Sequence, residues 1–472
     1  MRRPLIALLV GALVAAGGLL PSRASGLATD TLFMSANVTH VGILPEATAA
    51  ISIAFSSDTP HMYVSTLKGL HIYDTTDPKD PQRVGVLPLP HYQNEAMSLG
   101  ERKGQKFVII ASNQAAASAR GYYTATNRYI IIVDVTDPAN PVEIAGMETE
   151  TRTHTVSCLT KSCEYAYSDG RSQGQISIID LRKPEAPKMA GTYESVVPLG
   201  HDQDVDDAGI LWHVGGQGAV ALNVKNPTKP VPLASTDGRG VENADRERSP
   251  YNNFILHNSA RPNAKGFKAN AAPSLDNGNV FLATEEDTGA GQCGPEYGSF
   301  STWHIPYLDA GKYRNDNPDL QPGGGRIAPL DLWYPEDAAV GHACSAHYFD
   351  YHDSGFVAQG WYELGTRILD VRDPKNIKQV GFFFNNAMET WAAYWGPSRN
   401  KKGKATGRPS NIVYTADAAR GVDILEVDLP TKGPKKTRSV EAPRLPAWLQ
   451  AQRKQLTVPS KDWGFACRTI LE

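Results

Sequence analysis

The sequence has little of what marks a helical or a nucleic-acid-binding protein. The body of the chain has no long amphipathic segments rich in Ala, Leu, Glu and Lys, whereas Gly (42), Pro (33) and Tyr (19) are frequent among its 472 residues. This balance favours strands and turns over helices. The formal net charge of -3 lacks the basic excess of a general nucleic-acid binder, so we expect no nucleic-acid partner.

Long hydrophobic runs are also scarce, and the longest lies at the start of the sequence. Two arginines precede the apolar run 5–20, and the sequence SRA at 22–24 has the small-x-small pattern of a cleavage site. We therefore expect residues 1–24 to be a signal peptide. The alternative is an uncleaved anchor, although the run is short for a membrane span. Because no later segment is apolar enough to cross a bilayer, the mature protein is expected to be secreted, periplasmic or at the cell surface.

Cysteine occurs only five times. Export permits disulfides, and two strand-like runs flank the short turn between Cys158 and Cys163, so their sulfurs can face each other. A disulfide there is favoured over free thiols. We also expect Cys293 to pair with Cys344, because both belong to one face of the fold inferred below. The alternative for Cys344 is a soft metal ligand, and Cys467 is expected to be unpaired.

One phrase recurs five times along the chain. IYDTTDPKDPQRVGVLPLP begins at Ile72, IVDVTDPANPVEIAGMETE at Ile132 and IIDLRKPEAPKMAGTYES at Ile178, and weaker copies begin at Ala221 and Ile368. Each copy has an apolar strand, an Asp or Asn that can bond to the turn backbone, a Pro-containing corner and a second strand. Another strand pair precedes each phrase. Four-stranded units of about 40 to 50 residues are typical of propeller blades.

These units predict an all-β fold, a seven-bladed β-propeller of four-stranded blades over residues 38–428. VFLATEED and FSTWHI supply strands of a degenerate fifth blade, and NIVYTADAARGVDILEVD belongs to the seventh. The seventh blade lacks a fourth strand, whereas HVGILPE near the start of the chain matches the RVGVLPLP that ends the first unit. Residues 41–45 are therefore expected to complete the seventh blade and close the ring.

The I-V-D-V-x-D-P-x-x-P phrases resemble the LVIVD repeat of secreted and cell-surface bacterial and archaeal proteins. The resemblance covers most of residues 38–428 and implies a β-propeller, but it brings no catalytic motif. Blade five departs most from the pattern, with insertions at 287–299 and 315–329. Beyond the propeller, the basic, Pro-containing tail 429–472 is expected either to attach the protein to an acidic surface or a partner, or to lie solvated on the propeller.

Aligning the innermost strands of the blades reveals a ring of His and Glu. The aligned strands begin EAMS, HTVS, HDQD, HNSA, HACS and ETWA, and only the first blade, with AAIS, differs. Innermost strands surround the channel and start at one face, so we expect six side chains at the channel mouth, where a ligand would bind: Glu95, His154, His201, His257, His342 and Glu389.

Imidazoles and carboxylates are ligands that Zn, Cu, Fe and Mn prefer, and three or four suffice for one ion. We predict that the ring binds one such transition metal through His154, His201, His257 and His342. The alternative is that the ring residues bond to one another and to ordered waters without a metal. In HACSAHYFDYH, residues 342–352, His347 has the opposite strand parity to His342 and is expected to pack between blades.

Turns between the second and third strands of the blades open on the same face as the ring. They add further candidates for the site: Asp169, His213, Glu285, Glu286, Trp361, Glu363 and Asp417. A site assembled from these positions would draw on many blades.

Two functions fit this pattern. The first is an exported, monomeric scaffold whose ring face binds a small molecule or an extracellular protein. The second is a metal-dependent enzyme, an oxidoreductase or a hydrolase, acting at the channel mouth. No Ser-His-Asp order, phosphate-binding Gly loop or paired-carboxylate motif identifies a reaction, so the sequence assigns no catalytic residue. A structural role in the cell envelope ranks third.

Overall fold

The computed structural model describes most of the chain between residues 31 and 443. The described residues are 31–88, 95–112, 129–170, 175–197, 199–216, 218–236, 255–286, 294, 298–313, 327–336, 344–385 and 388–443. From Leu32 onward they belong to one compact unit. Among them, no helix combines the length and the apolar character that a membrane span needs. The predicted signal peptide 1–24 lies outside the described residues.

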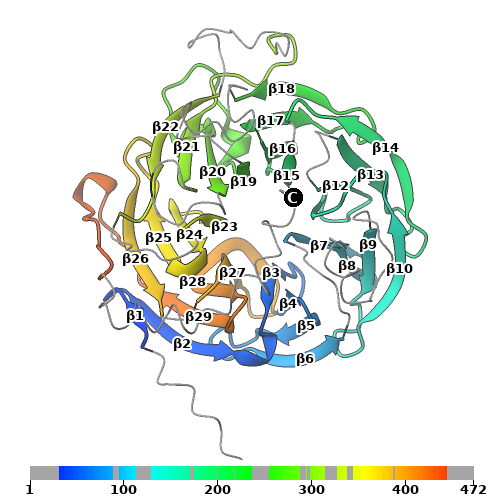
Figure 1. Ribbon diagram of the computed structural model, residues 1–472, viewed down its shortest axis with the longest axis horizontal. Coiled ribbons are helices and arrows are strands. Elements are labelled where there is room, and N and C mark those ends of the chain that lie inside the picture. The colour runs from blue at the N-terminus through cyan, green and yellow to red at the C-terminus, as the bar shows by residue number, and fades with distance from the viewer. Residues whose placement is uncertain are drawn as a thin grey trace, which may run out of the picture. The chain divides into compact units, whose positions relative to one another are not determined.

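Antiparallel sheets are arranged as blades around a common centre, as Figure 1 shows. In each of the first five blades the chain runs from the innermost strand outward. Their strands are β3 (Ala50–Phe55), β4 (His61–Thr66), β5 (Gly69–Asp74) and β6 (Gln82–Leu87); β7 (Met97–Arg102), β8 (Gln105–Ser112), β9 (Tyr129–Asp134) and β10 (Val142–Glu148); β11 (Thr155–Cys158), β12 (Tyr165–Asp169), β13 (Gln175–Asp180) and β14 (Lys188–Glu194); β15 (Gly200–Val205), β16 (Ile210–Gly215), β17 (Gly218–Asn223) and β18 (Val231–Ser235); β19 (Ile255–Ala260), β20 (Val280–Glu286), β21 (Phe300–His304) and β22 (Ala328–Trp333).

The last two blades share one nine-stranded sheet, because a parallel bridge between Tyr348 and Ala392 joins their innermost strands. Blade six contains β23 (Ala346–His352), β24 (Phe356–Trp361), β25 (Gly365–Asp370) and β26 (Lys378–Phe384), and blade seven contains β27 (Thr390–Arg399), β28 (Ala405–Asp417), β29 (Gly421–Val427) and β2 (Val38–Leu44). Short 3-10 turns occur at η1 (Pro45–Ala47), η2 (Ala264–Gly266), η3 (Leu275–Asn277), η4 (Tyr362–Leu364) and η5 (Pro434–Lys436).

The predicted closure is confirmed. Strand β2, from the start of the described chain, pairs antiparallel with β29, with Gly42 opposite Ile424. His40 Nε2 lies 2.8 Å from Asp423 Oδ1 across the same pair. One feature was not predicted: β1 (Phe33–Met34) adds a strand to the outer edge of blade six by pairing with β26. The first described residues thus contribute to both blades that the chain completes last.

The repeated phrase works as the sequence predicts. Asp74 Oδ1 accepts the backbone N–H of Thr76 at 2.7 Å, and Asp134 Oδ1 accepts that of Thr136 at 2.8 Å. The equivalent residues of the other copies also accept the N–H two positions later: Asp180, Asn223 and Asp370. Such bonds fix the tight corner between the third and fourth strands, because the side chain satisfies a donor that the ladder leaves open.

Apolar side chains pack between neighbouring blades rather than in a single centre. For example, Phe107 and Ile109 of blade two pack with Val156 and Ala166 of blade three. Since every blade is held by its two neighbours, the innermost strands are fixed at regular positions around the channel.

The first part of the tail lies against blade six. Lys378 Nζ donates to the carbonyl oxygens of Pro434 (2.9 Å) and Thr437 (3.2 Å), and the N–H of Val440 donates to the carbonyl of Gln379 at 2.9 Å. The described part of the tail therefore packs against blade six through these hydrogen bonds and through Ala442, which is buried in the adjoining core cluster.

We expect Val38→Ala to test the closure. Val38 is 3% exposed and packs with residues of blades six and seven, including Phe383 and Leu425. Removing two buried methyl groups should lower the free energy of unfolding by about 2 kcal/mol. Thr39 is the next residue and is exposed, so Thr39→Ala should change it by less than about 0.5 kcal/mol. Urea denaturation measures both, and equal effects would contradict a packed closure.

Candidate metal centre

The bridges between neighbouring innermost strands define which residues are equivalent. Ala96 pairs in parallel with Thr155, and Tyr348 pairs in parallel with Ala392. The residues one position earlier are Glu95 and His154 in the first pair. In the second pair they are His347 and Trp391. The ring position of blade six is therefore occupied by His347, and that of blade seven by Trp391.

This register places other residues at the ring position than the sequence alignment does in two blades. The prediction that His347 packs between blades is wrong, because its Nε2 lies 3.7 Å from Glu95 Oε1 within the channel cluster. Parity counted from His342 fails because β23 begins only at Ala346. His342 itself lies outside the described residues. Glu389 precedes β27 and belongs to neither group of potential metal ligands among the described residues.

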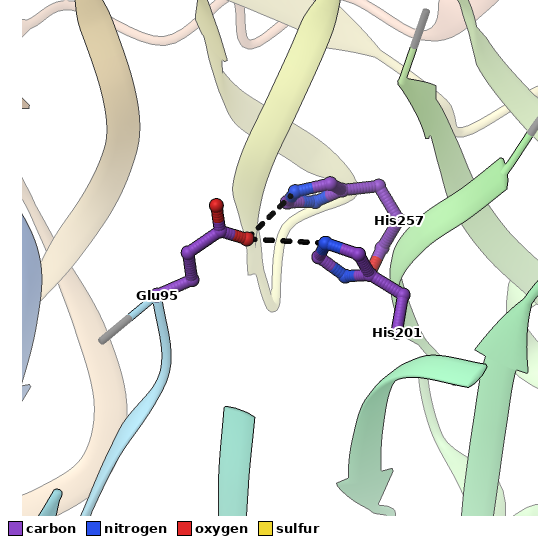
Figure 2. Close-up of side chains that lie close together, drawn as sticks. All are labelled: Glu95, His201 and His257. Atoms are coloured by element: carbon purple, nitrogen blue, oxygen red, sulfur yellow. Dashed lines mark hydrogen bonds and ion pairs between the residues drawn. The ribbon is translucent and has the colours of Figure 1, made fainter. Parts of the chain in front are cut away.

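Three imidazoles converge on one carboxylate oxygen of Glu95. Glu95 Oε2 lies 2.9 Å from His154 Nε2, 3.1 Å from His201 Nε2 and 3.2 Å from His257 Nε2. Figure 2 shows His201 and His257 reaching this oxygen from the side opposite to the Glu95 backbone. All four residues have 0% exposure. Each comes from a different blade, so the contact exists only in the assembled ring.

A second carboxylate extends the cluster toward blade six. Glu286, at the end of β20, has Oε2 at 3.8 Å from His257 Nε2 and Oε1 at 3.9 Å from His347 Nε2. The Tyr362 hydroxyl donates to Glu286 Oε1. The ring centroids of His257 and His347 are 4.0 Å apart, and the next pair, His201 and His257, are 4.1 Å apart. The imidazoles thus follow one another around the channel.

The backbone determines which nitrogen of two rings carries a proton. His201 Nδ1 lies 3.1 Å from the carbonyl oxygen of His257, and His347 Nδ1 lies 2.6 Å from that of Trp391. A carbonyl only accepts, so both Nδ1 atoms must carry the hydrogen. In the neutral rings the Nε2 lone pairs then point at the carboxylates. Metal-bound histidines commonly show this donation from the other nitrogen to a carbonyl.

His154 Nε2 lies 2.9 Å from Glu95 Oε2 and 3.1 Å from His201 Nε2, so a hydrogen on this nitrogen can be donated to either. The Nε2 lone pairs of His201 and His347 still face carboxylate oxygens, and a cation between them relieves the repulsion. It can be a proton, which makes an imidazolium, or a metal ion. Among the described residues, two groups have the mutual distances of a metal site: Glu95, His201 and His257, and His257, Glu286 and His347. His257 is common to both, and neither of its ring nitrogens has a hydrogen bond within the described part of the chain.

Burial and neighbouring groups shift the pKa values of the cluster residues in opposite directions. Burial alone would raise the pKa of Glu95, but its interactions with His154, and then with His201 and His257, hold this pKa well below its usual value. Burial lowers the pKa of His257 well below its usual value, and the charges of His347 and His201 lower it further. Burial also opposes a charge on His347, yet Glu95 and Glu286 raise the pKa of His347. Without a metal, His347 therefore holds a proton more readily than His257 does.

Asp169 and His213, two further candidates from the sequence, form a separate network. Asp169 Oδ2 accepts the Nε2–H of His213 at 2.8 Å, the Ser195 hydroxyl donates to His213 Nδ1 at 2.7 Å, and the N–H of Val197 donates to Ser195 Oγ at 3.2 Å. All three side chains are buried. Because the serine oxygen is buried and both of its bonds are internal, we assign this network to the joining of blades three and four.

The remaining turn candidates are buried at the same end of the blades. Trp361 Nε1 donates to Cys344 Sγ at 3.3 Å, and Asp417 Oδ2 accepts from the Thr390 hydroxyl at 3.0 Å. Glu285 and Glu363 are 0% and 7% exposed. Of the seven turn positions, Glu286 alone is in a potential metal-binding group among the described residues.

The predicted disulfide between Cys158 and Cys163 is confirmed. Cys344 is also disulfide-bonded, so it offers no thiolate to a metal. Its partner is outside the described residues, where Cys293 and Cys467 both fall. The pairing of Cys293 with Cys344 stays a prediction.

Comparisons with known proteins assign no family to this chain. No family model matches the sequence. No curated protein matches it either. Among solved structures, the β-propeller domain of Cps50 (Swd1) from Myceliophteria thermophila is similar at 9% sequence identity and a TM-score of 0.49, covering 83% of this chain and 100% of that one. A likeness this distant carries no argument about function, and the fold described above rests on the blades themselves.

The depressed pKa of Glu95 gives a pH-dependent test on metal-free protein. Glu95 contributes stability while ionised, so this contribution is present above its ordinary value of 4.5 and is lost as the pH falls through the lower folded value. Glu95→Gln should therefore lower the melting temperature at pH 6, and the gap to wild type should shrink as the pH falls below about 4.

Glu426→Gln is the control, because the Glu426 side chain is 45% exposed and forms a surface pair with Lys79. It should leave the pH profile unchanged. A gap between wild type and Glu95→Gln that stays constant from pH 7 to pH 3 would mean that the charge of Glu95 is not what matters.

Proposed function

We propose that this chain is an exported, LVIVD-like β-propeller that binds one transition metal ion in its channel and presents it to a ligand. One observation carries the proposal: the Nε2 lone pairs of His201 and His347 face buried carboxylates, with their Nδ1 hydrogens committed to backbone carbonyls. A cation satisfies both sides of this contact. The proposed ligand set is Glu95, His154, His201, His257, Glu286 and His347.

The donor atoms restrict the metal. Imidazole nitrogen and carboxylate oxygen suit Zn, Cu, Fe and Mn, and no described cysteine provides a thiolate. When bound, such an ion would act as a Lewis acid, activate water or carry an electron. The chain's own part is to fix the imidazoles through the Nδ1 bonds of His201 and His347, and to position Glu286 through Tyr362.

Several features support export. The segment 1–24 has the pattern of a signal peptide, and the repeat phrases resemble those of secreted and cell-surface proteins. The disulfide between Cys158 and Cys163 is expected in an oxidising compartment. We propose a monomer whose channel takes a small molecule, with the extracellular protein partner as the alternative. The hydrogen bonds between the tail and blade six favour a tail that lies on the propeller over one that attaches the protein to an acidic surface.

A metal-dependent enzyme is the second candidate function, favoured by a specific observation. A cavity of about 370 Å³ begins one residue beyond the cluster along the innermost strands, where Asp202, Asn258 and Tyr348 follow His201, His257 and His347. A substrate in this cavity would lie beside the metal. Whether the reaction is an oxidation or a hydrolysis depends on the ion.

Elemental analysis tests the proposal. The mature protein, purified without a tag and dialysed, should contain about one transition metal ion per chain. His347→Gln should weaken binding of that metal by at least about 100-fold, since it removes a ligand rather than an outer partner. His352→Gln is the matched control on the same strand: its Nδ1 bonds to Ser354 instead, so metal content should not change.

Wild-type protein that stays metal-free after incubation with Zn, Cu, Fe and Mn salts would contradict the proposal. So would metal binding that His347→Gln leaves intact, because the site would then lie elsewhere.

A further inference from the structure

The cavity beside the cluster is the central channel itself. Its wall includes a residue from every innermost strand: Ser52, Met97, Val156, Asp202, Ser259, Tyr348 and Tyr394. The ring of Tyr348 is 4.6 Å from that of His257 and 5.2 Å from that of His347, measured between centroids. One tyrosine therefore borders both the proposed metal centre and the cavity.

The wall of this cavity has more carboxyl groups than basic groups. Its carboxyl groups are Asp202, Asp204, Asp206 and Asp350, and its one basic group is Arg261. Arg261 is already paired, because its guanidinium lies 2.8 Å from Asp206 Oδ2. Three carboxyl groups thus remain without a cationic partner in the wall.

Polar atoms of the wall are also unpartnered. Asp202 Oδ1, Ser52 Oγ, Ser259 Oγ and the Tyr348 hydroxyl have no hydrogen bond within the described residues. Their side chains are only 2% to 4% exposed. A buried polar group without a partner costs about 1 to 3 kcal/mol, so such a concentration at one cavity indicates a ligand that supplies the missing bonds.

The arrangement of the carboxyl groups distinguishes between an ion and a larger cation. Asp202, Asp204 and Asp350 do not form a group with the mutual distances of a metal site among the described residues. They are instead distributed around the cavity, with Asp202 and Asp204 on β15 and Asp350 on β23. A metal ion needs its ligands around one point, whereas an organic cation of several atoms can reach separate carboxylates.

We propose that the channel cavity binds a small organic cation bearing one or more primary ammonium groups. The ammonium groups bond to Asp202, Asp204 and Asp350, and the rings of Tyr348 and Tyr394 border the ligand's carbon chain. The inference deepens the proposed function and rests on it only in placing this ligand next to a metal.

Protonation of the empty cavity supports the same conclusion. Burial raises the pKa of Asp350 to about 7. Without a cation Asp350 is therefore partly protonated at neutral pH, and a bound ammonium replaces the proton as the compensating charge.

Isothermal titration calorimetry of the mature protein at pH 7.5 tests the proposal. The probes are ethanolamine, 1,4-diaminobutane and spermidine, with 1,4-butanediol as the neutral counterpart of the diamine. At least one amine should bind at least about tenfold more tightly than the diol. Asp202→Asn and Asp350→Asn lie in two different blades, and each should weaken the binding of that amine at least about tenfold.

Asp207→Asn is the matched control, because Asp207 is exposed and outside the cavity wall. It should bind the amine like wild type. Melting curves of all variants identify any that do not fold, and a pair of cavity variants on separate strands keeps the test valid if one is lost.

Metal analysis of the same samples separates this inference from the proposed function. Asp202→Asn should retain its metal, because Asp202 is in neither potential metal-binding group. Wild type that holds metal but binds no amine more tightly than the diol would overturn the inference alone. Amine binding by a wild type that holds no metal would overturn the proposed function alone. Amine binding that both cavity variants preserve would place the ligand elsewhere and overturn the inference.

Discussion

The contact on which the channel depends is a buried carboxylate surrounded by imidazoles. Glu95 receives His154, His201 and His257 on one oxygen, and His347 approaches the other. Two backbone carbonyls take the Nδ1 hydrogens of His201 and His347 and thereby turn their lone pairs inward. A cation satisfies a centre so arranged, because the Nε2 lone pairs of His201 and His347 otherwise face the lone pairs of carboxylate oxygens.

The propeller makes this contact possible because it delivers one side chain per blade to a common circle. The proposed ligands from different blades are separated by tens of positions in the sequence, so only the folded propeller brings them together. The ring must therefore be closed for the site to exist. The ring is closed by the pairing of β2 with β29 and by the packing of Val38 against blades six and seven. This closure therefore supports the channel site as well as the stability of the protein.

The sequence predicts the blades well because their signal is local. An Asp or Asn that bonds to the residue two positions later marks each corner, whatever the rest of the chain does. Glu95, His154, His201, His257 and Glu286 could be found by aligning these units. His347 could not, because its register depends on where β23 begins, and Cys344 and Ser345 are not part of the strand. Strand β1 was missed because two residues carry no periodic pattern. The cavity depends on side chains from all seven innermost strands, which only the folded ring brings together.

The most direct measurement is anomalous diffraction from crystals of the metal-loaded protein, with data collected on both sides of the absorption edge of the bound metal. The account predicts one strong peak among His201, His257 and His347, at about 2.0 to 2.3 Å from an Nε2 and from a carboxylate oxygen of Glu95 or Glu286. A channel without such a peak, with Glu95 instead bonded to protonated imidazoles, would contradict the claim that the cluster is a metal centre.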